Sequence, residues 1–93
     1  MKLPVNYTKL TPKEKREVRE EYIKIQGGKC MWCGDDIYGT PPEKILNKEI
    51  NWRNFPKGFL ANPIHLQHDH HTLLTEGAVH AYCNAVMWQY HNR

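Results

Sequence analysis

Long apolar runs are absent from this sequence of 93 residues, of which 40% are hydrophobic. A helix that spans a bilayer needs about 18 or more consecutive apolar residues, so we expect no membrane span and no membrane partner. The first ten residues, Met1 to Leu10, also contain no apolar core of the kind that a secretory signal requires. These observations predict a cytoplasmic protein, and the length predicts one domain, 1–93.

Cysteine is scarce, and the odd number of three does not suit a framework of disulfide bonds. Cys30 and Cys33 form a C-x-x-C pair, but the sequence lacks the βαβ pattern that a thioredoxin-like redox motif would need. His80 and Cys83 repeat the spacing, which gives C-x2-C-x46-H-x2-C. Zinc takes four such ligands in a tetrahedron. We therefore predict a structural Zn2+ that stabilises a small domain; the alternative is free cysteines and a surface histidine.

The charge is mildly basic and unevenly spread. Lys and Arg number 13 against 10 Asp and Glu, and 12 of the 13 cations lie within residues 1–58. All six histidines lie between His65 and His91. This balance is compatible with a phosphate-backbone partner. The candidates for phosphate contacts are Lys29, Arg53 and Lys57, for which ordinary solubilising charge is the competing interpretation.

A helix is predicted over residues 11–27. Thr11 can cap it, Pro12 suits its first position, and Glu14 completes a capping box. Val18, Tyr22 and Ile25 then share one helix face, and a Gly-Gly pair at 27–28 ends the helix.

The remaining pattern predicts a small α+β domain. Its segments are a zinc knuckle at 30–34, an insert without clear period at 35–63, a strand at 64–70, a connection at 72–77, a short second strand at 78–79 and a helix at 80–90. Within the insert, residues 45–52 suit either a short helix or a strand. Trp88 and Tyr90 are expected in the core.

The segment 65–71, His-Leu-Gln-His-Asp-His-His, is too polar for an ordinary core strand. On a strand, His68 and His70 would share one face, and His65, Gln67 and Asp69 the other. Imidazoles beside a carboxylate can serve as general base and metal ligands; an exposed strand or a metal site without catalysis is the plainer interpretation. Asn84 directly follows the last predicted zinc ligand, and its amide oxygen is a ligand suited to Mg2+.

Three blocks of the sequence together resemble the HNH nucleases, and especially the phage recombination endonuclease VII type. The blocks are Gly28–Gly34, His68–Thr72 and Gly77–Asn84. The resemblance spans residues 11–91 apart from the insert. It implies a zinc-stabilised ββα-metal fold at 64–91, preceded by the N-terminal helix. It also implies a DNA endonuclease that uses Mg2+ or Mn2+ on double-stranded or branched DNA, in the cytoplasm of a host cell or encoded by a phage.

The resemblance also assigns roles within the candidate catalytic site. It makes His68 the general base, His70 a phosphate contact and Asn84 a ligand of the catalytic ion, and His80 stands where the family usually has cysteine. Gln67 occupies the place of an Asp or His ligand, and its uncharged oxygen would bind the ion more weakly. Asp69 or His65 could ligate instead, or the register could shift by two, with Asp69 as ligand and His70 as base. We prefer the unshifted register, because Thr72 and the distance to His80 then match the family.

Two other functions fit the same residues. The first is a zinc-dependent nucleic-acid-binding module that has no catalytic activity. The second is a zinc-organised protein-interaction domain. For a nuclease, a homodimer would give so small a chain more surface with which to grip two strands.

Overall fold

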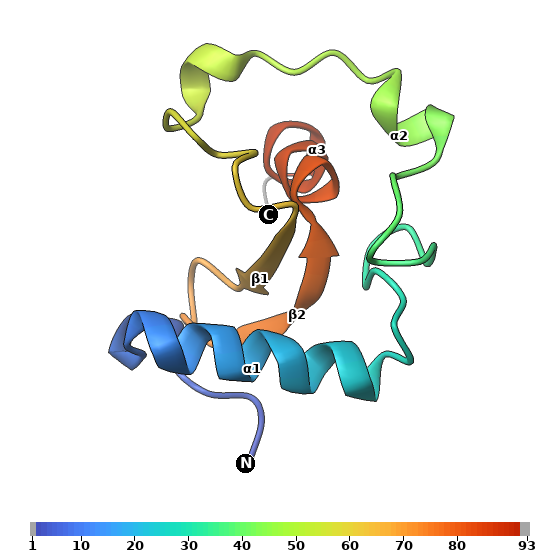
Figure 1. The fold of residues 1–93 in the computed structure, drawn as a ribbon. Helices are drawn as coiled ribbons and strands as arrows, with labels where there is room; N and C mark the ends of the chain where they lie inside the picture. Colours follow the sequence, from blue (N-terminus) through green and yellow to red (C-terminus); the bar gives the residue numbers. More distant parts are fainter. Residues whose placement is uncertain (1, 92–93) are drawn as a thin grey trace.

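The computed structural model describes residues 2–91, which form a two-stranded sheet flanked by helices (Figure 1). The predicted α+β class is confirmed. The elements in chain order are η1 Tyr7–Lys9, α1 Pro12–Ile25, α2 Glu43–Leu46, η2 Trp52–Asn54, β1 Ile64–His68, β2 Thr75–His80 and α3 Ala81–His91. Helix α1 packs against the sheet, and α3 follows β2 without a connecting loop.

Helix α1 begins as predicted. The Glu14 amide donates to Thr11 Oγ1 at 3.1 Å, and the Thr11 amide donates to Glu14 Oε1 at 2.9 Å, which completes the capping box. These two hydrogen bonds give partners to the backbone amides of Glu14 and Thr11, which the start of a helix would otherwise leave unpaired. At the other end, Gly27 and Gly28 adopt φ of +65° and +76°, a conformation that glycine takes without steric cost.

The buried face of α1 differs from the prediction at one position. Val18 and Tyr22 are buried as expected, but Ile25 is 65% exposed, and Ile23 is buried in its place. Just beyond the helix, the Gln26 side chain binds both the amide and the carbonyl of Ala78 in β2, each at 2.9 Å, and so ties the end of α1 to the sheet.

Strands β1 and β2 pair antiparallel, with a register irregularity between Gln67 and His68. The strand predicted to reach residue 70 ends at His68, and β2 begins at Thr75, inside the predicted connection. Asp69 explains the early end, because its carboxylate accepts the amides of residues 71 and 72 at 2.7 and 2.9 Å and closes a turn. The predicted two-face alternation of residues 65–70 was therefore wrong beyond His68.

The N-terminal segment is tied to the sheet rather than loose. Val5 accepts the Thr75 amide at 2.9 Å, and the Tyr7 amide donates to the Leu73 carbonyl at 2.8 Å. Tyr22 of α1 reaches the same place, with its hydroxyl 2.9 Å from Thr75 Oγ1. These contacts bring the Tyr7 ring against His68, where it stacks at 4.0 Å between centroids.

Helix α3 anchors the predicted insert. The hydroxyl of Tyr82 donates to the Lys48 carbonyl at 2.8 Å, and that of Tyr90 to the Glu49 carbonyl at 2.6 Å. Figure 1 shows the insert as a long path between α2 and β1 that passes around α3. Trp88 and Tyr90 are each 45% exposed, so their expected place in the core was wrong. The ambiguous stretch 45–52 contains the end of the four-residue helix α2 and the first residue of η2, and the rest of it is irregular.

The orientation of α1 predicts opposite effects for two isoleucines in the same helix. Replacing buried Ile23 with Ala should lower the free energy of unfolding by about 2 to 5 kcal/mol, because it leaves a cavity. Replacing exposed Ile25 with Ala should change it by less than about 0.5 kcal/mol. Urea denaturation of both variants measures the difference, and equal losses would contradict the orientation.

Candidate metal centre and adjoining groove

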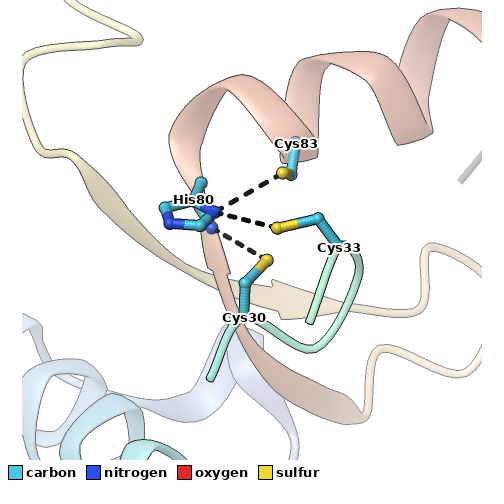
Figure 2. Close-up of side chains that lie close together, drawn as sticks. All are labelled: Cys30, Cys33, His80 and Cys83. Carbon is cyan, nitrogen blue, oxygen red and sulfur yellow. Dashed lines mark hydrogen bonds between the residues drawn. The ribbon is translucent and has the colours of Figure 1, made fainter. Parts of the chain in front are cut away.

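The four predicted zinc ligands meet at one point. Cys30, Cys33, His80 and Cys83 each offer a ligand atom, and these atoms all lie within 4.8 Å of one another. Figure 2 shows the side chains converging from the knuckle and from the junction of β2 with α3. Three of the four are buried, and this group could hold a zinc ion as predicted. The alternative of a surface His80 is wrong, because only 3% of that residue is exposed.

Local backbone structure aims the two cysteines of the knuckle. The Gly34 amide donates to the Cys30 carbonyl at 3.0 Å, and Gly34 has φ of +81°, so the chain reverses within one turn. The Met31 amide donates to the Ala78 carbonyl at 3.0 Å and fixes the turn against β2. The knuckle is therefore held beside His80, the last residue of β2, by backbone hydrogen bonds.

The His80 ring is oriented by a backbone carbonyl. Its Nε2 lies 2.9 Å from the Asp36 carbonyl oxygen, which can only accept, so Nε2 carries the proton. The lone pair of Nδ1 then faces the thiols, 3.4 Å from Cys33 Sγ and 3.6 Å from Cys83 Sγ. Carbonyls commonly fix metal-binding histidines in this way. We infer Nδ1 as the ligand atom of His80.

The three thiols share their protons unequally. The hydrogen bond from Cys83, helped by nearby backbone amides, lowers the pKa of Cys30 to about 4 despite its burial. The same hydrogen bond and burial raise the pKa of Cys83, and burial raises that of Cys33. The cluster therefore favours a thiolate at Cys30 and disfavours thiolates at Cys33 and Cys83. A bound dication would stabilise the additional negative charges.

A groove of about 450 Å³ runs along the free edge of β1. It is bounded by α1, by β1, by α3 and by residues 54–62 of the insert. The polar side chains in its lining are those of Tyr7, Lys15, Arg19, Asn54, Asn62, His65, Gln67, His68, His70, Asn84 and Trp88. Its lining, as far as residues 2–91 show it, contains two permanent cations and no carboxylate. Such a surface attracts anions.

Two of the groove's histidines lie side by side, with the His68 and His70 rings 4.7 Å apart. Burial, followed by the charges of His70 and Lys15, lowers the pKa of His68 below its usual range. The ring nitrogens of His68 have no hydrogen-bond partner within the described part of the chain. His70 differs, because its Nε2 accepts the indole N–H of Trp88 at 2.8 Å.

Asn84, in the first turn of α3, also lines the groove. Its Nδ2 is 3.0 Å from His65 Nδ1, and His65 Nε2 is 2.8 Å from the Phe59 carbonyl. Burial lowers the pKa of His65. The Asn84 side-chain oxygen is buried and has no hydrogen-bond partner among the described residues. Gln67 is also buried, and its Nε2 donates to the His68 carbonyl at 2.9 Å.

The structure gathers some predicted site residues and leaves out others. Gln67, His68, His70 and Asn84 all line the groove, but the half-buried Asp69 does not. Its carboxylate closes the turn instead, and the backbone amides of residues 71 and 72 lower its pKa. The predicted phosphate contacts Lys29, Arg53 and Lys57 are also absent from the lining.

Six polar residues that line the groove were not predicted from the sequence as site residues: Tyr7, Lys15, Arg19, Asn54, Asn62 and Trp88. A signal existed only for the pair on α1, because Lys15 and Arg19 are four residues apart and share a helix face. Nothing in the local pattern indicated that this face borders the histidine strand. Tyr7 and Trp88 reach the groove through long-range packing.

Comparison of the chain with protein-family models, with curated proteins and with solved structures gives no match. None of the helices formed by residues 2–91 has the length and apolar character needed to cross a membrane. The function must therefore be inferred from the metal centre and the groove themselves.

The geometry of the metal centre predicts one zinc ion per chain, on which the fold depends. Chelation of the zinc should remove most of the cooperative thermal unfolding transition, because the knuckle and the start of α3 lose their link. Cys83→Ser should lower the zinc content well below one, whereas the control His71→Ala, at an exposed position, should keep it. Metal analysis and circular dichroism measure both. A metal-free protein that unfolds at the same temperature would contradict the prediction.

Proposed function

We propose that the protein is a metal-dependent DNA endonuclease of the HNH type that hydrolyses phosphodiester bonds and carries a structural zinc. In this proposal the consecutive elements β1, β2 and α3 form the ββα-metal motif. The observation that carries the proposal is the composition of the groove. It gathers His68, His70 and Asn84 with Lys15 and Arg19, and no carboxylate in the described lining opposes a phosphate.

His68 is suited to activate water. Its lowered pKa keeps the imidazole neutral near neutral pH, and its ring nitrogens have no competing partner among residues 2–91. A neutral imidazole with a free lone pair can take the proton from an attacking water. His70 is less suited, because Trp88 occupies its Nε2 lone pair. This contrast supports the unshifted register, with His68 as base.

His70 then has a different role. With Nε2 accepting from Trp88, the neutral ring carries its proton on Nδ1. That N–H can donate to a phosphate oxygen next to His68, since the two rings are 4.7 Å apart. Tyr7 stacks on the other side of His68 and restricts its rotation.

The groove fits a divalent ion only in part. The buried oxygen of Asn84, which has no hydrogen-bond partner among residues 2–91, is a suitable hard ligand, and Gln67 belongs to the same lining. No carboxylate belongs to the described lining, although Glu76 accepts from Gln67 Nε2 at 3.4 Å, so we expect weak binding of Mg2+ or Mn2+ without DNA. When bound, the ion would stabilise negative charge on the phosphate and the leaving oxygen. Asp69 is not part of this donor set.

The missing carboxylate also supports a second candidate function. A zinc-dependent module that binds nucleic acid without cutting it would need the cationic groove but no catalytic ion. Lys15 and Arg19 would serve both functions equally, so DNA binding alone does not separate them. Cleavage and its metal dependence do.

The nuclease proposal predicts cleavage of supercoiled plasmid in Mg2+ or Mn2+ but not in EDTA. His68→Ala should lower the cleavage rate by about 10² to 10⁴-fold, the usual contribution of a general base. The exposed His71→Ala is the matched control and should cut normally. Zinc content and circular dichroism would verify that both variants fold.

Two outcomes would contradict parts of this proposal. Cleavage that survives His68→Ala but is lost in His70→Ala would move the base by two positions. DNA binding by zinc-loaded protein without cleavage in any metal would leave the binding module as the function.

The groove also predicts which cations of α1 touch DNA. Arg19→Gln should reduce the slope of log affinity against log salt concentration by about 1, because one phosphate contact is lost. Arg16→Gln removes the same charge from an exposed position of the same helix that does not line the groove. Fluorescence anisotropy at several salt concentrations compares the two variants. Equal slopes would contradict the prediction that DNA binds in the groove.

A further inference from the structure

His65 stands between a backbone carbonyl and the side chain of Asn84. Its Nε2 lies 2.8 Å from the Phe59 carbonyl oxygen, and its Nδ1 lies 3.0 Å from Asn84 Nδ2. A carbonyl oxygen only accepts hydrogen bonds, so Nε2 must carry the proton. The neutral ring then has its lone pair on Nδ1, where it accepts an N–H of the Asn84 amide.

This arrangement determines which way the Asn84 amide points. If the amide were flipped, its oxygen would face the lone pair of His65 Nδ1, and two acceptors would oppose each other. The observed orientation instead turns the oxygen away from His65, and that oxygen is buried without a partner in the described residues. A buried oxygen without a donor costs free energy, so the orientation needs a neighbour that enforces it.

We propose that His65 is a positioning residue, which holds the Asn84 amide so that its oxygen is kept as a ligand for a divalent cation in the groove that Asn84 lines. The role of the Asn84 oxygen as a cation ligand rests on the proposed function. The hydrogen bonds by which His65 orients the Asn84 amide do not depend on that function. It also removes His65 from the candidate metal ligands, because both ring nitrogens are already engaged. Phe59, from the insert, sets the tautomer through its carbonyl and packs its ring edge-on at 4.7 Å.

The first test needs no variant. In zinc-loaded protein with 15N-labelled histidine, long-range 1H–15N spectra should show His65 as the neutral Nε2–H tautomer. One proton of the Asn84 side-chain amide, assigned by its loss in Asn84→Asp, should be shifted downfield and exchange slowly with water. An Nδ1–H tautomer for His65, or a rapidly exchanging Asn84 amide, would overturn the proposal.

The second test measures cation binding rather than cleavage. Electron paramagnetic resonance of free Mn2+ in a titration of zinc-loaded protein gives the affinity. His65→Phe should weaken Mn2+ binding by about 10 to 100-fold, as loss of an orienting partner usually does. His65→Asn retains an acceptor near the Nδ1 position and should recover part of the loss. An unchanged affinity in His65→Phe, at normal zinc content, would overturn the proposal.

The outcomes separate this inference from the nuclease proposal. The expected NMR pattern in a protein that neither binds Mn2+ nor cuts DNA would support the role of His65 in orienting Asn84 and contradict the nuclease. Cleavage by a protein whose His65 is the Nδ1–H tautomer would support the nuclease and contradict the positioning role. His71→Phe, at an exposed position outside the groove, is the matched control for both tests.

Discussion

The meeting of Cys30, Cys33, His80 and Cys83 is the constraint on which the other features of this small protein depend. It joins two parts of the chain at the point where β2 becomes α3. Asn84 directly follows the last of these residues, so the same junction sets the position from which its amide reaches the groove. A domain of 93 residues buries a smaller fraction of its surface than a large domain does, so a link between distant segments adds to its stability. A cation shared by the three thiols and the imidazole would supply that constraint.

Backbone carbonyls of the irregular insert orient a histidine at each site. The Asp36 carbonyl holds His80 so that Nδ1 faces the thiols, and the Phe59 carbonyl holds His65 so that Nδ1 faces Asn84. In the first case the free lone pair of the ring points to the cysteine sulfurs; in the second it points to another side chain. The insert thus acts through its backbone, and side chains of α3 such as Tyr82 hold that backbone in place.

The difference between local and long-range determinants explains what the sequence could predict. The capping box at Thr11, the C-x-x-C knuckle and the pairing of His80 with Cys83 are local patterns, and each has its predicted structure. The insert showed no helical or strand periodicity. Side chains of α3 form hydrogen bonds with its backbone, in place of the regular backbone hydrogen bonds of a helix or sheet. The groove depends on packing between α1 and β1, so Arg19 could not be placed beside the histidines from spacing alone.

X-ray absorption at the zinc edge of purified, zinc-loaded protein examines the constraint directly. Three sulfur ligands at about 2.3 Å and one nitrogen at about 2.0 Å would match the cluster of three cysteines with His80 Nδ1. A folded protein that holds no zinc, or a zinc bound by fewer than three sulfurs, would contradict it. Such a result would also remove the link that holds Asn84 in the lining of the groove.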